Sequence, residues 1–220
     1  MDGLDVKRSE IAGRFIRGGN GIEIGAFGRP VQLPAGANVL YLDKYSALDT
    51  AKQHGLNHAV TPEPDIRDDG TALHKILDGS LDFLIACHFL EHCEDFIGTV
   101  EAHCRKIKPL GILFYILPDK SRMFDCRRVE TTTWDHLEKD HIDPSISRER
   151  HISEWCRHVF PDANREAIRQ CPESIHFHAW SSQEQTELWD NICRLVPLQI
   201  HFTESLTEWP EVISVLRRLQ

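Results

Sequence analysis

The sequence predicts an α/β fold in which helices cover both faces of a mostly parallel sheet. Three observations favour this fold class. Apolar runs of strand length alternate with stretches whose apolar residues recur at helical spacing, as in chains built from βαβ units. The first apolar run ends in a glycine turn, and the second ends in an aspartate. Since α/β proteins bind ligands at strand ends, the same pattern predicts a binding site there.

The N-terminal part of the chain supplies one helix and the first strands. Residues 5–16 are expected to form a helix, because their apolar positions share one face. Gly18-Gly19 then ends it. Apolar runs predict strands at residues 21–25 and 38–43, and a weaker one at 58–66 that prolines interrupt.

The middle of the chain contains the clearest strand, at residues 81–87. Helical spacing predicts a helix over residues 95–107, which Pro109-Leu110-Gly111 separates from a fifth strand at 112–117.

The C-terminal part resumes the alternation. A serine followed three residues later by Glu184 predicts a helix from residue 181 to 195. Two closing strands are then expected at residues 198–202 and 212–216.

Residues 119–180 break this rhythm. They are polar and rich in histidine, arginine and tryptophan, with helices expected near 132–139 and 147–159. A loop of this length without structure of its own is rare in a compact domain. We therefore interpret the segment as an acceptor-binding helical cap, inserted after the fifth strand of a single domain that spans residues 1–220.

Composition limits the class of protein and its partners. No apolar run approaches the roughly 18 residues that span a bilayer, and the acidic N-terminus lacks an apolar signal core. We therefore expect a cytoplasmic protein without a membrane span. The formal net charge of −9 argues against nucleic acid as a partner. The oligomeric state stays open.

Cysteine and histidine form no recognisable metal or disulfide pattern. The seven cysteines are scattered and never spaced as Cys-x-x-Cys. The thirteen histidines include no helical His-x-x-x-His pair with a convincing carboxylate partner. We expect buried, reduced thiols and assign no metal.

The glycine turn and the strand-end acid are the first signs of a ligand. Gly25 and Gly28 follow the first strand and allow the backbone to approach a ligand closely. Glu23 could orient this turn or reach a polar group of the ligand. Asp43 comes about 20 residues later, the spacing at which an acid accepts hydrogen bonds from a ribose; it could instead cap the next helix. Together they favour nucleoside binding.

These motifs resemble those of class I methyltransferases that use S-adenosylmethionine (SAM). Glu23-Ile-Gly-Ala-Phe-Gly28 is similar to the first motif of that family, and Asp43 to its ribose-binding acid. Residues 65–70 resemble the segment that closes over the adenine, and residues 80–92 the fourth motif. Phe27 and Arg29 stand where the family often has glycine. The match extends from Gly21 to Lys120, and the closing strands agree with the family's last hairpin.

The resemblance implies a Rossmann-like, mostly parallel seven-stranded sheet with an antiparallel C-terminal strand, and SAM as the cofactor. The cofactor-binding residues that it implies are Glu23, Gly25, Ala26, Phe27, Gly28, Asp43, Lys44, Asp65, Ile66, Cys87 and His88.

A narrower resemblance concerns the acceptor. His88-Phe-Leu-Glu-His92, Pro118-Asp-Lys120 and Phe177-His-Ala-Trp180 are similar to a bacterial group associated with surface-polysaccharide biosynthesis. This implies methyl transfer to a hydroxyl of a saccharide, sugar nucleotide or other small molecule. Two alternatives stay open: an N-methyltransferase that acts on a nucleotide or protein, and a non-catalytic domain that binds SAM or a nucleoside.

A hydroxyl acceptor needs a base, for which histidine is the natural choice. We expect His136 in the cap to act as that base, with His88 as the second candidate. The charged residues expected to bind the acceptor are Asp119, Lys120, Asp125 and Arg128. A solvated charged surface is the alternative interpretation of this set.

Overall fold

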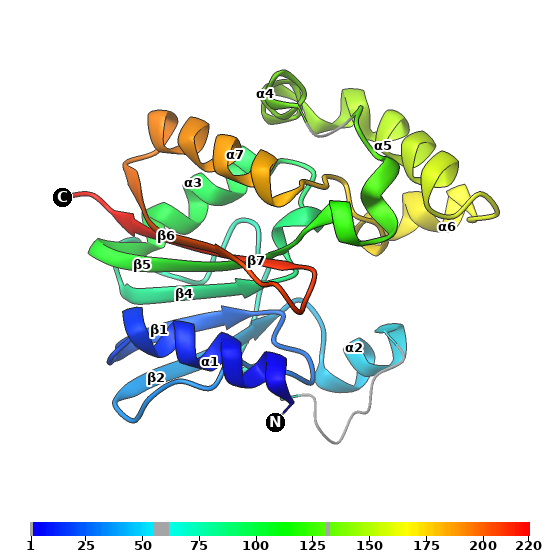
Figure 1. Cartoon of the computed structure of the whole chain (residues 1–220). Coiled ribbons are helices and arrows are strands. Elements are labelled where there is room, and N and C mark those ends of the chain that lie inside the picture. Colours follow the sequence, from blue (N-terminus) through cyan, green and yellow to red (C-terminus); the bar gives the residue numbers. More distant parts are fainter. Residues whose placement is uncertain (1, 55–61, 131–132) are drawn as a thin grey trace.

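The computed structural model describes residues 2–54, 62–130 and 133–220. Seven strands form one sheet in the order β3-β2-β1-β4-β5-β7-β6 (Figure 1). All neighbouring pairs are parallel except those of β7, which is antiparallel to β5 and to β6. The predicted fold class is therefore confirmed. The strands are β1 (Gly19–Ile24), β2 (Ala37–Asp43), β3 (Ile66–Arg67), β4 (Leu81–Cys87), β5 (Ile107–Pro118), β6 (Leu198–Ser205) and β7 (Glu211–Arg218).

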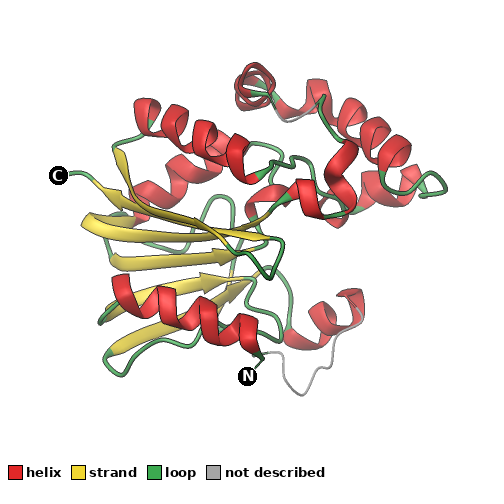
Figure 2. Cartoon of the chain, viewed as in Figure 1, coloured by secondary structure: helices red, strands yellow, loops and turns green. Residues whose placement is uncertain are grey.

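Helices cover both faces of the sheet (Figure 2). Helix α1 (Gly3–Phe15) packs on one face, where Ile11 belongs to the same apolar cluster as Phe83 and Phe114. Helices α3 (Phe96–Lys106) and α7 (Ser182–Leu195) pack on the other, where Trp189 joins Leu84. Strand β4 is thus apolar at successive positions because both of its sides are buried. Helix α2 (Ala47–His54) follows β2.

Two strands differ from the prediction. Strand β5 begins at Ile107, directly after α3, and includes Pro109-Leu110-Gly111 as an irregularity in its pairing with β4. Leu110 has a φ of 66°, and a Cβ on Gly111 would lie 2.9 Å from the Lys108 carbonyl oxygen. The tight backbone approach explains why glycine stands there. Of the expected strand at 58–66, residues 58–61 lie outside the described residues, and only Ile66 forms part of β3.

Residues 119–180, called the cap below, form a helical layer at the end of the sheet to which β1 and β4 point (Figure 1). The cap leaves β5 and returns beside it: Asp119 forms an isolated bridge with Trp180, and Lys120 N donates to Trp180 O at 2.9 Å. Its elements are the short 3-10 helices Lys120–Arg122, Phe124–Arg127 and Pro172–Ser174 and the α-helices α4 (Trp134–Ile142), α5 (Pro144–His158) and α6 (Arg165–Gln170). Residue 132, where the first cap helix was expected to begin, lies outside the described residues.

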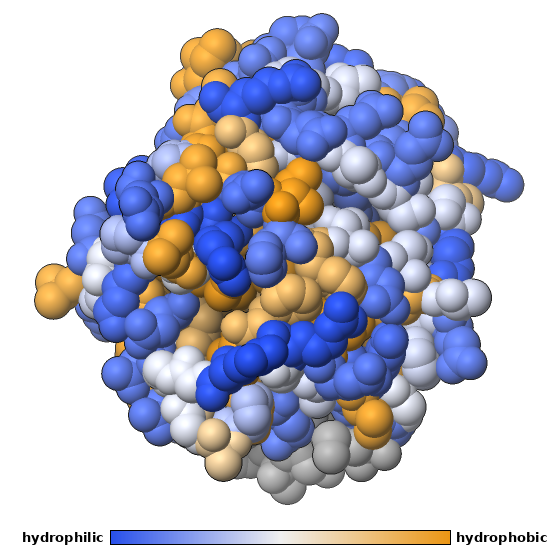
Figure 3. All heavy atoms as spheres, turned by 60° about the vertical axis from the view of Figure 1, so that its left-hand side comes forward, coloured by the Kyte–Doolittle hydropathy of each residue, from blue (hydrophilic) through white to orange (hydrophobic). Residues whose placement is uncertain are grey.

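The part of the surface shown in Figure 3 is mostly hydrophilic, with smaller apolar patches between charged side chains. Exposed large apolar residues such as Leu77 and Ile142 are normal on a folded protein. No helix in the described parts of the chain is long and apolar enough to cross a membrane.

Candidate functional site

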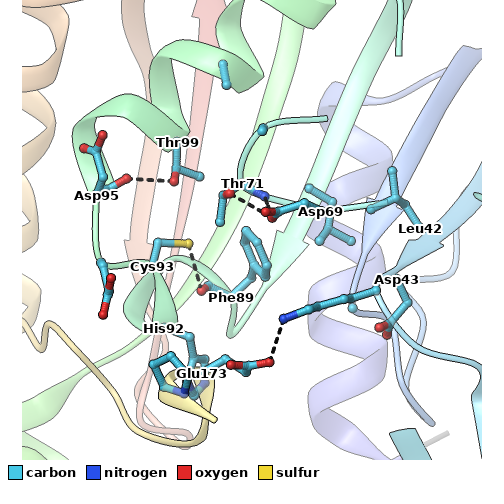
Figure 4. A pocket seen from close by; sticks show the side chains of 18 of the residues that line it. Leu42, Asp43, Asp69, Thr71, Phe89, His92, Cys93, Asp95, Thr99 and Glu173 are labelled. Atoms are coloured by element: carbon cyan, nitrogen blue, oxygen red, sulfur yellow. Dashed lines mark hydrogen bonds and ion pairs between the residues drawn. The ribbon is translucent and has the colours of Figure 1, made fainter. Parts of the chain in front are cut away.

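A large pocket opens at the carboxyl ends of β1, β2 and β4. The chain runs outward from β1 to β3 and then returns to place β4 on the other side of β1, so the strand order reverses there. Ligands of open α/β sheets bind at such a reversal. The cavity has a volume of about 1070 Å³. Figure 4 shows Asp43 on one side of it and Asp95 on the opposite side.

Five of the predicted cofactor residues line this pocket, and six do not. Those in the lining are Gly25, Phe27, Asp43, Lys44 and His88. Those outside it are Glu23, Ala26, Gly28, Asp65, Ile66 and Cys87.

The turn after β1 brings backbone to the pocket. Gly25 has a φ of 61°, and a Cβ placed on it would have only Phe27 Cζ as a neighbour, at 3.9 Å, so its backbone is open to a ligand. Phe27 has a φ of 48°, a conformation that favours glycine. The methyltransferase family whose motifs this sequence resembles often has glycine at this position, and the positive φ agrees with that preference.

Glu23 supports the turn and does not reach the pocket. It is fully buried, and its two carboxylate oxygens accept the Val31 backbone N–H at 3.1 and 3.2 Å. Burial raises its pKa to about 8, although the Val31 hydrogen bond and the positive charge of Arg8 act in the opposite direction. Of the two roles considered for Glu23, the structure supports the orientation of the turn.

The end of β2 contributes an acid and a contact with the cap. Asp43 accepts a hydrogen bond from Tyr45 N at 3.0 Å and lies in the pocket wall. Lys44 Nζ donates to Glu173 Oε1 of the cap at 3.0 Å, and the Tyr45 hydroxyl donates to the same oxygen at 2.8 Å. These contacts join the end of β2 to the cap.

The loop after β3 lines the pocket with Asp69 and Gly70, the last two residues of the predicted segment 65–70, and with the two residues that follow. Asp65 instead accepts Tyr41 N at 2.8 Å and holds β2, and Ile66 is part of β3. The pocket wall is formed by residues 69–72. Asp69 Oδ1 accepts the backbone N–H and the hydroxyl of Thr71, both at 2.8 Å, which fixes the loop (Figure 4).

His88 lies in a row of buried charges at the end of β4. Its Nε2 lies 2.9 Å from Glu211 Oε1, and its Nδ1 forms an ion pair with Glu91 Oε1 at 3.3 Å. Arg8 donates to both oxygens of Glu211. Burial acts against the charged ring, but the pairing with Glu211 and Glu91 outweighs it and raises the pKa of His88 to about 9.

A histidine that is protonated at neutral pH cannot accept a proton, so this geometry argues against His88 as the base. Cys87, the residue before it, lies beside the same charges. Burial raises the pKa of its thiol, which keeps the side chain neutral.

The charged row predicts a pH dependence of stability. The folded-state pKa of His88, about 9, exceeds its ordinary value of 6.5, so the ion pairs stabilise fully below pH 6.5 and are lost as the pH rises through about 9. Glu23 acts in the same direction, because the folded chain keeps its proton up to about pH 8 whereas the unfolded chain releases it near 4.5. We expect the melting temperature to fall from pH 6.5 to about 9.

The His88→Gln variant should show a shallower fall in a thermal denaturation series at constant salt. Solvent screens part of the effect, since 32% of the side chain is exposed. His158→Gln, in the last turn of α5, serves as the control. Parallel curves for wild type and His88→Gln would contradict the assigned charge.

The four residues expected to bind the acceptor form a buried frame inside the cap. None lies in the pocket wall, and Asp119, Lys120, Asp125 and Arg128 are all at most 5% exposed. Asp119 accepts the Ser121 N–H and hydroxyl.

The other three hold neighbouring segments together. Lys120 Nζ donates to Glu184 at 2.9 Å and to the Arg128 carbonyl at 3.0 Å. Arg128 donates to Asp125 and Glu154 at 3.1 Å each. The acceptor-binding prediction is therefore corrected: these buried charges bind other groups of the protein and lie outside the pocket wall.

His136 also lies away from the pocket wall. It is 4% exposed, and its Nε2 faces His151 Nε2 at 3.1 Å and Asp140 Oδ2 at 3.3 Å. Burial lowers its pKa. This placement argues against the predicted role as the base.

His92 is a pocket residue whose chemistry the sequence analysis did not identify. It lines the cavity, and its Nδ1 lies 2.9 Å from the Ile175 carbonyl oxygen, which can only accept. Burial lowers its pKa. The neutral ring therefore donates from Nδ1 and has its lone pair on Nε2. The contact that fixes this tautomer joins residues 83 positions apart, so no local sequence signal indicates it.

No protein-family model matches the sequence, and no curated protein matches it. Solved structures are similar along nearly its whole length. A putative methyltransferase from Bacillus halodurans C-125 has a TM-score of 0.55 at 9% identity, covering 99% of this chain and 100% of that one. A SAM-dependent methyltransferase from Aquifex aeolicus has a TM-score of 0.52 at 9% identity, covering 99% and 94%.

The CurJ carbon methyltransferase has a TM-score of 0.55 at 13% identity, covering 100% of this chain and 56% of that one, so this chain spans little more than half of its length. At these identities the likeness establishes the fold, which is the Rossmann-like fold of methyltransferases.

Proposed function

We propose that this chain is a SAM-dependent methyltransferase that transfers a methyl group to a hydroxyl of a saccharide, sugar nucleotide or other small molecule. The observation that carries the proposal is the pocket at the strand-order reversal. It brings the open backbone at Gly25 and the strand-end acid Asp43 together in a methyltransferase fold.

The residues of the pocket fit a nucleoside with a charged amino-acid tail. Asp43 ends β2, where a carboxylate can accept both hydroxyls of a ribose. The loop at residues 69–72 supplies backbone groups and two small residues, Gly70 and Ala72, for a flat base. SAM would supply an already activated methyl group, so the chain's own task is to hold an acceptor in line with it and to exclude water.

His92 replaces His136 and His88 as the proposed base. It lies in the wall of the same pocket, its ring is neutral at pH 7 because burial lowers its pKa, and Nε2 carries the lone pair. A base of this kind typically contributes about 10²–10⁴-fold to turnover. Ile175, which fixes the ring, directly follows residues 172–174 of the cap, and these line the pocket.

The pocket wall contains charges of both signs. Five carboxylates line it, from Asp43, Asp69, Glu94, Asp95 and Glu173, together with the basic side chains of Lys44, His88, Arg105 and Lys106. The net charge of −9 disfavours a nucleic acid, which needs a basic surface.

Calorimetry with SAM and a radiolabel screen test the proposal in two steps. We expect SAM to bind, and label to pass to one fraction among cell glycans, sugar nucleotides and metabolites. His92→Asn should lower turnover at saturating SAM by about 10²–10⁴-fold and leave SAM affinity nearly unchanged. His158→Asn, outside the pocket wall, is the matched control.

Each outcome has a separate meaning. A folded chain that does not bind SAM overturns the proposal. Binding without transfer to any fraction would indicate a non-catalytic SAM-binding domain. Transfer to nitrogen that His92→Asn does not slow would favour the N-methyltransferase alternative.

A further inference from the structure

A second cluster of ligand-type side chains lies inside the cap, separate from the pocket wall. His136 and Asp140 are one turn apart on α4, and His151 faces them from α5. The three side chains are at most 4% exposed. Neither the fold nor the proposed reaction requires ionisable groups at this place.

Three atoms of the cluster converge on one point. His136 Nε2 lies 3.1 Å from His151 Nε2, and Asp140 Oδ2 lies 3.3 Å from the first nitrogen and 2.9 Å from the second. Zinc bound at about 2.0–2.2 Å to nitrogen and oxygen in a tetrahedron separates its ligand atoms by roughly 3.3–3.6 Å. The observed edges come within about half an ångström of that triangle.

The hydrogen bonds around His151 leave the three atoms of this triangle with fewer N–H donors than contacts. His151 Nδ1 lies 2.7 Å from the Phe177 carbonyl oxygen and must donate to it. In the neutral ring Nε2 then carries a lone pair, yet it faces a carboxylate oxygen and a second imidazole nitrogen. One proton can satisfy only part of these contacts, whereas one cation can satisfy all three.

The outer contacts are those that orient metal ligands. The Ser147 hydroxyl donates to Asp140 Oδ1 and leaves Oδ2 for the triangle. The Phe177 carbonyl fixes the His151 tautomer from the other side. Partners of this kind commonly hold metal-binding histidines and carboxylates in place.

We propose that His136, Asp140 and His151 bind a divalent transition-metal ion, with zinc as the expected occupant. Two imidazoles and one carboxylate suit zinc better than magnesium or calcium, which prefer oxygen ligands. This inference replaces the expectation, drawn from the sequence, that the chain holds no metal. The site lacks the usual pair of histidines one helical turn apart, because α4 places a histidine and an aspartate at that spacing.

Because the three side chains are buried and lie outside the pocket wall, we assign the ion a structural role. Three protein ligands leave one position of a tetrahedral zinc ion for a water molecule or a fourth side chain. His178 Nε2 is a neighbour at 3.7 Å from Asp140 Oδ2, but it also lies 3.1 Å from the Glu94 carbonyl, so the proposal rests on the other three. The ion would join α4 and α5 to Phe177, which lines the pocket.

The experiment measures metal in the purified full-length chain by mass spectrometry, after growth in zinc-supplemented medium. We expect about one zinc per chain, a fall in melting temperature on chelation, and recovery when zinc is returned. Cobalt added to the chelated chain should give the visible absorption of a tetrahedral complex. Asp140→Asn and His151→Gln should each lose most of the metal, whereas His158→Gln on α5 should retain it.

Two results would overturn the proposal. One is a wild-type chain that contains no stoichiometric metal and whose melting temperature zinc does not raise, a measurement that depends on no variant. The other is metal that survives Asp140→Asn but is lost in His176→Asn, because Glu91, His92 and His176 form the other candidate group in the described residues. Neither readout uses methyl transfer, so the test is independent of the proposed function.

Discussion

Replacing Arg128 by methionine is expected to lower the free energy of unfolding by about 3–5 kcal/mol, the usual effect of breaking a buried ion pair. The Arg128 side chain is fully buried. Its guanidinium donates to Asp125 and Glu154 and also to the carbonyls of His176 and Phe177, at 2.6 and 2.7 Å. Methionine keeps much of the volume but leaves two carboxylates and two carbonyls without this partner.

Urea denaturation followed by circular dichroism measures the effect. Arg127→Met is the matched control, because the neighbouring arginine is exposed and its loss should change stability by no more than about 0.5 kcal/mol. Equal stabilities for the two variants would show that the frame of charges does not hold the cap together.

Replacing Asp43 by alanine is expected to reduce SAM affinity without unfolding the chain. A hydrogen bond to a charged group contributes about 1.5–3 kcal/mol, so each ribose bond lost costs roughly 10- to 150-fold in affinity. Asp43→Asn retains one acceptor oxygen and should lose less. Asp43 accepts the Tyr45 N–H within a turn at the end of β2, outside the apolar core, so we expect only a modest change in melting temperature.

Calorimetric titration of SAM into each variant tests this expectation. Asp162→Ala, at an exposed position of the cap, is the control and should bind as the wild type does. An unchanged dissociation constant for Asp43→Ala at full folding would place the nucleoside elsewhere in the pocket.

Local patterns were sufficient for most of the fold. The clearest predicted strand, residues 81–87, has the bounds of β4, because burial on both faces leaves a continuous apolar run. The helix from Ser181 onward forms with the expected reciprocal cap between Ser181 and Glu184. Asp43 lies in the pocket wall as its position at the end of a strand predicts, because that position depends only on the strand to which it belongs.

The site was harder to predict where pairing decides a residue's role. Nothing near His88 in the sequence indicates that Glu211, 123 residues away, keeps it protonated. In the sequence Arg128 and Asp125 resemble charged groups that could bind a substrate. In the fold, Arg128 pairs with Glu154, and Asp125 pairs with His176. These contacts join residues far apart in the sequence, so the structural role of the two residues could not be predicted from local patterns.

The place where the cap joins the sheet affects how such a chain can evolve. The two ends of the cap meet at Asp119 and Trp180. An inserted segment of this kind can be lengthened, shortened or exchanged without altering the order of the strands. Leu137 and Trp180 set the limit, since both are buried in the same apolar cluster as residues of α3 and α7. A replacement segment that supplies two apolar anchors there could place new side chains over the pocket while the strand ends beside it stay the same.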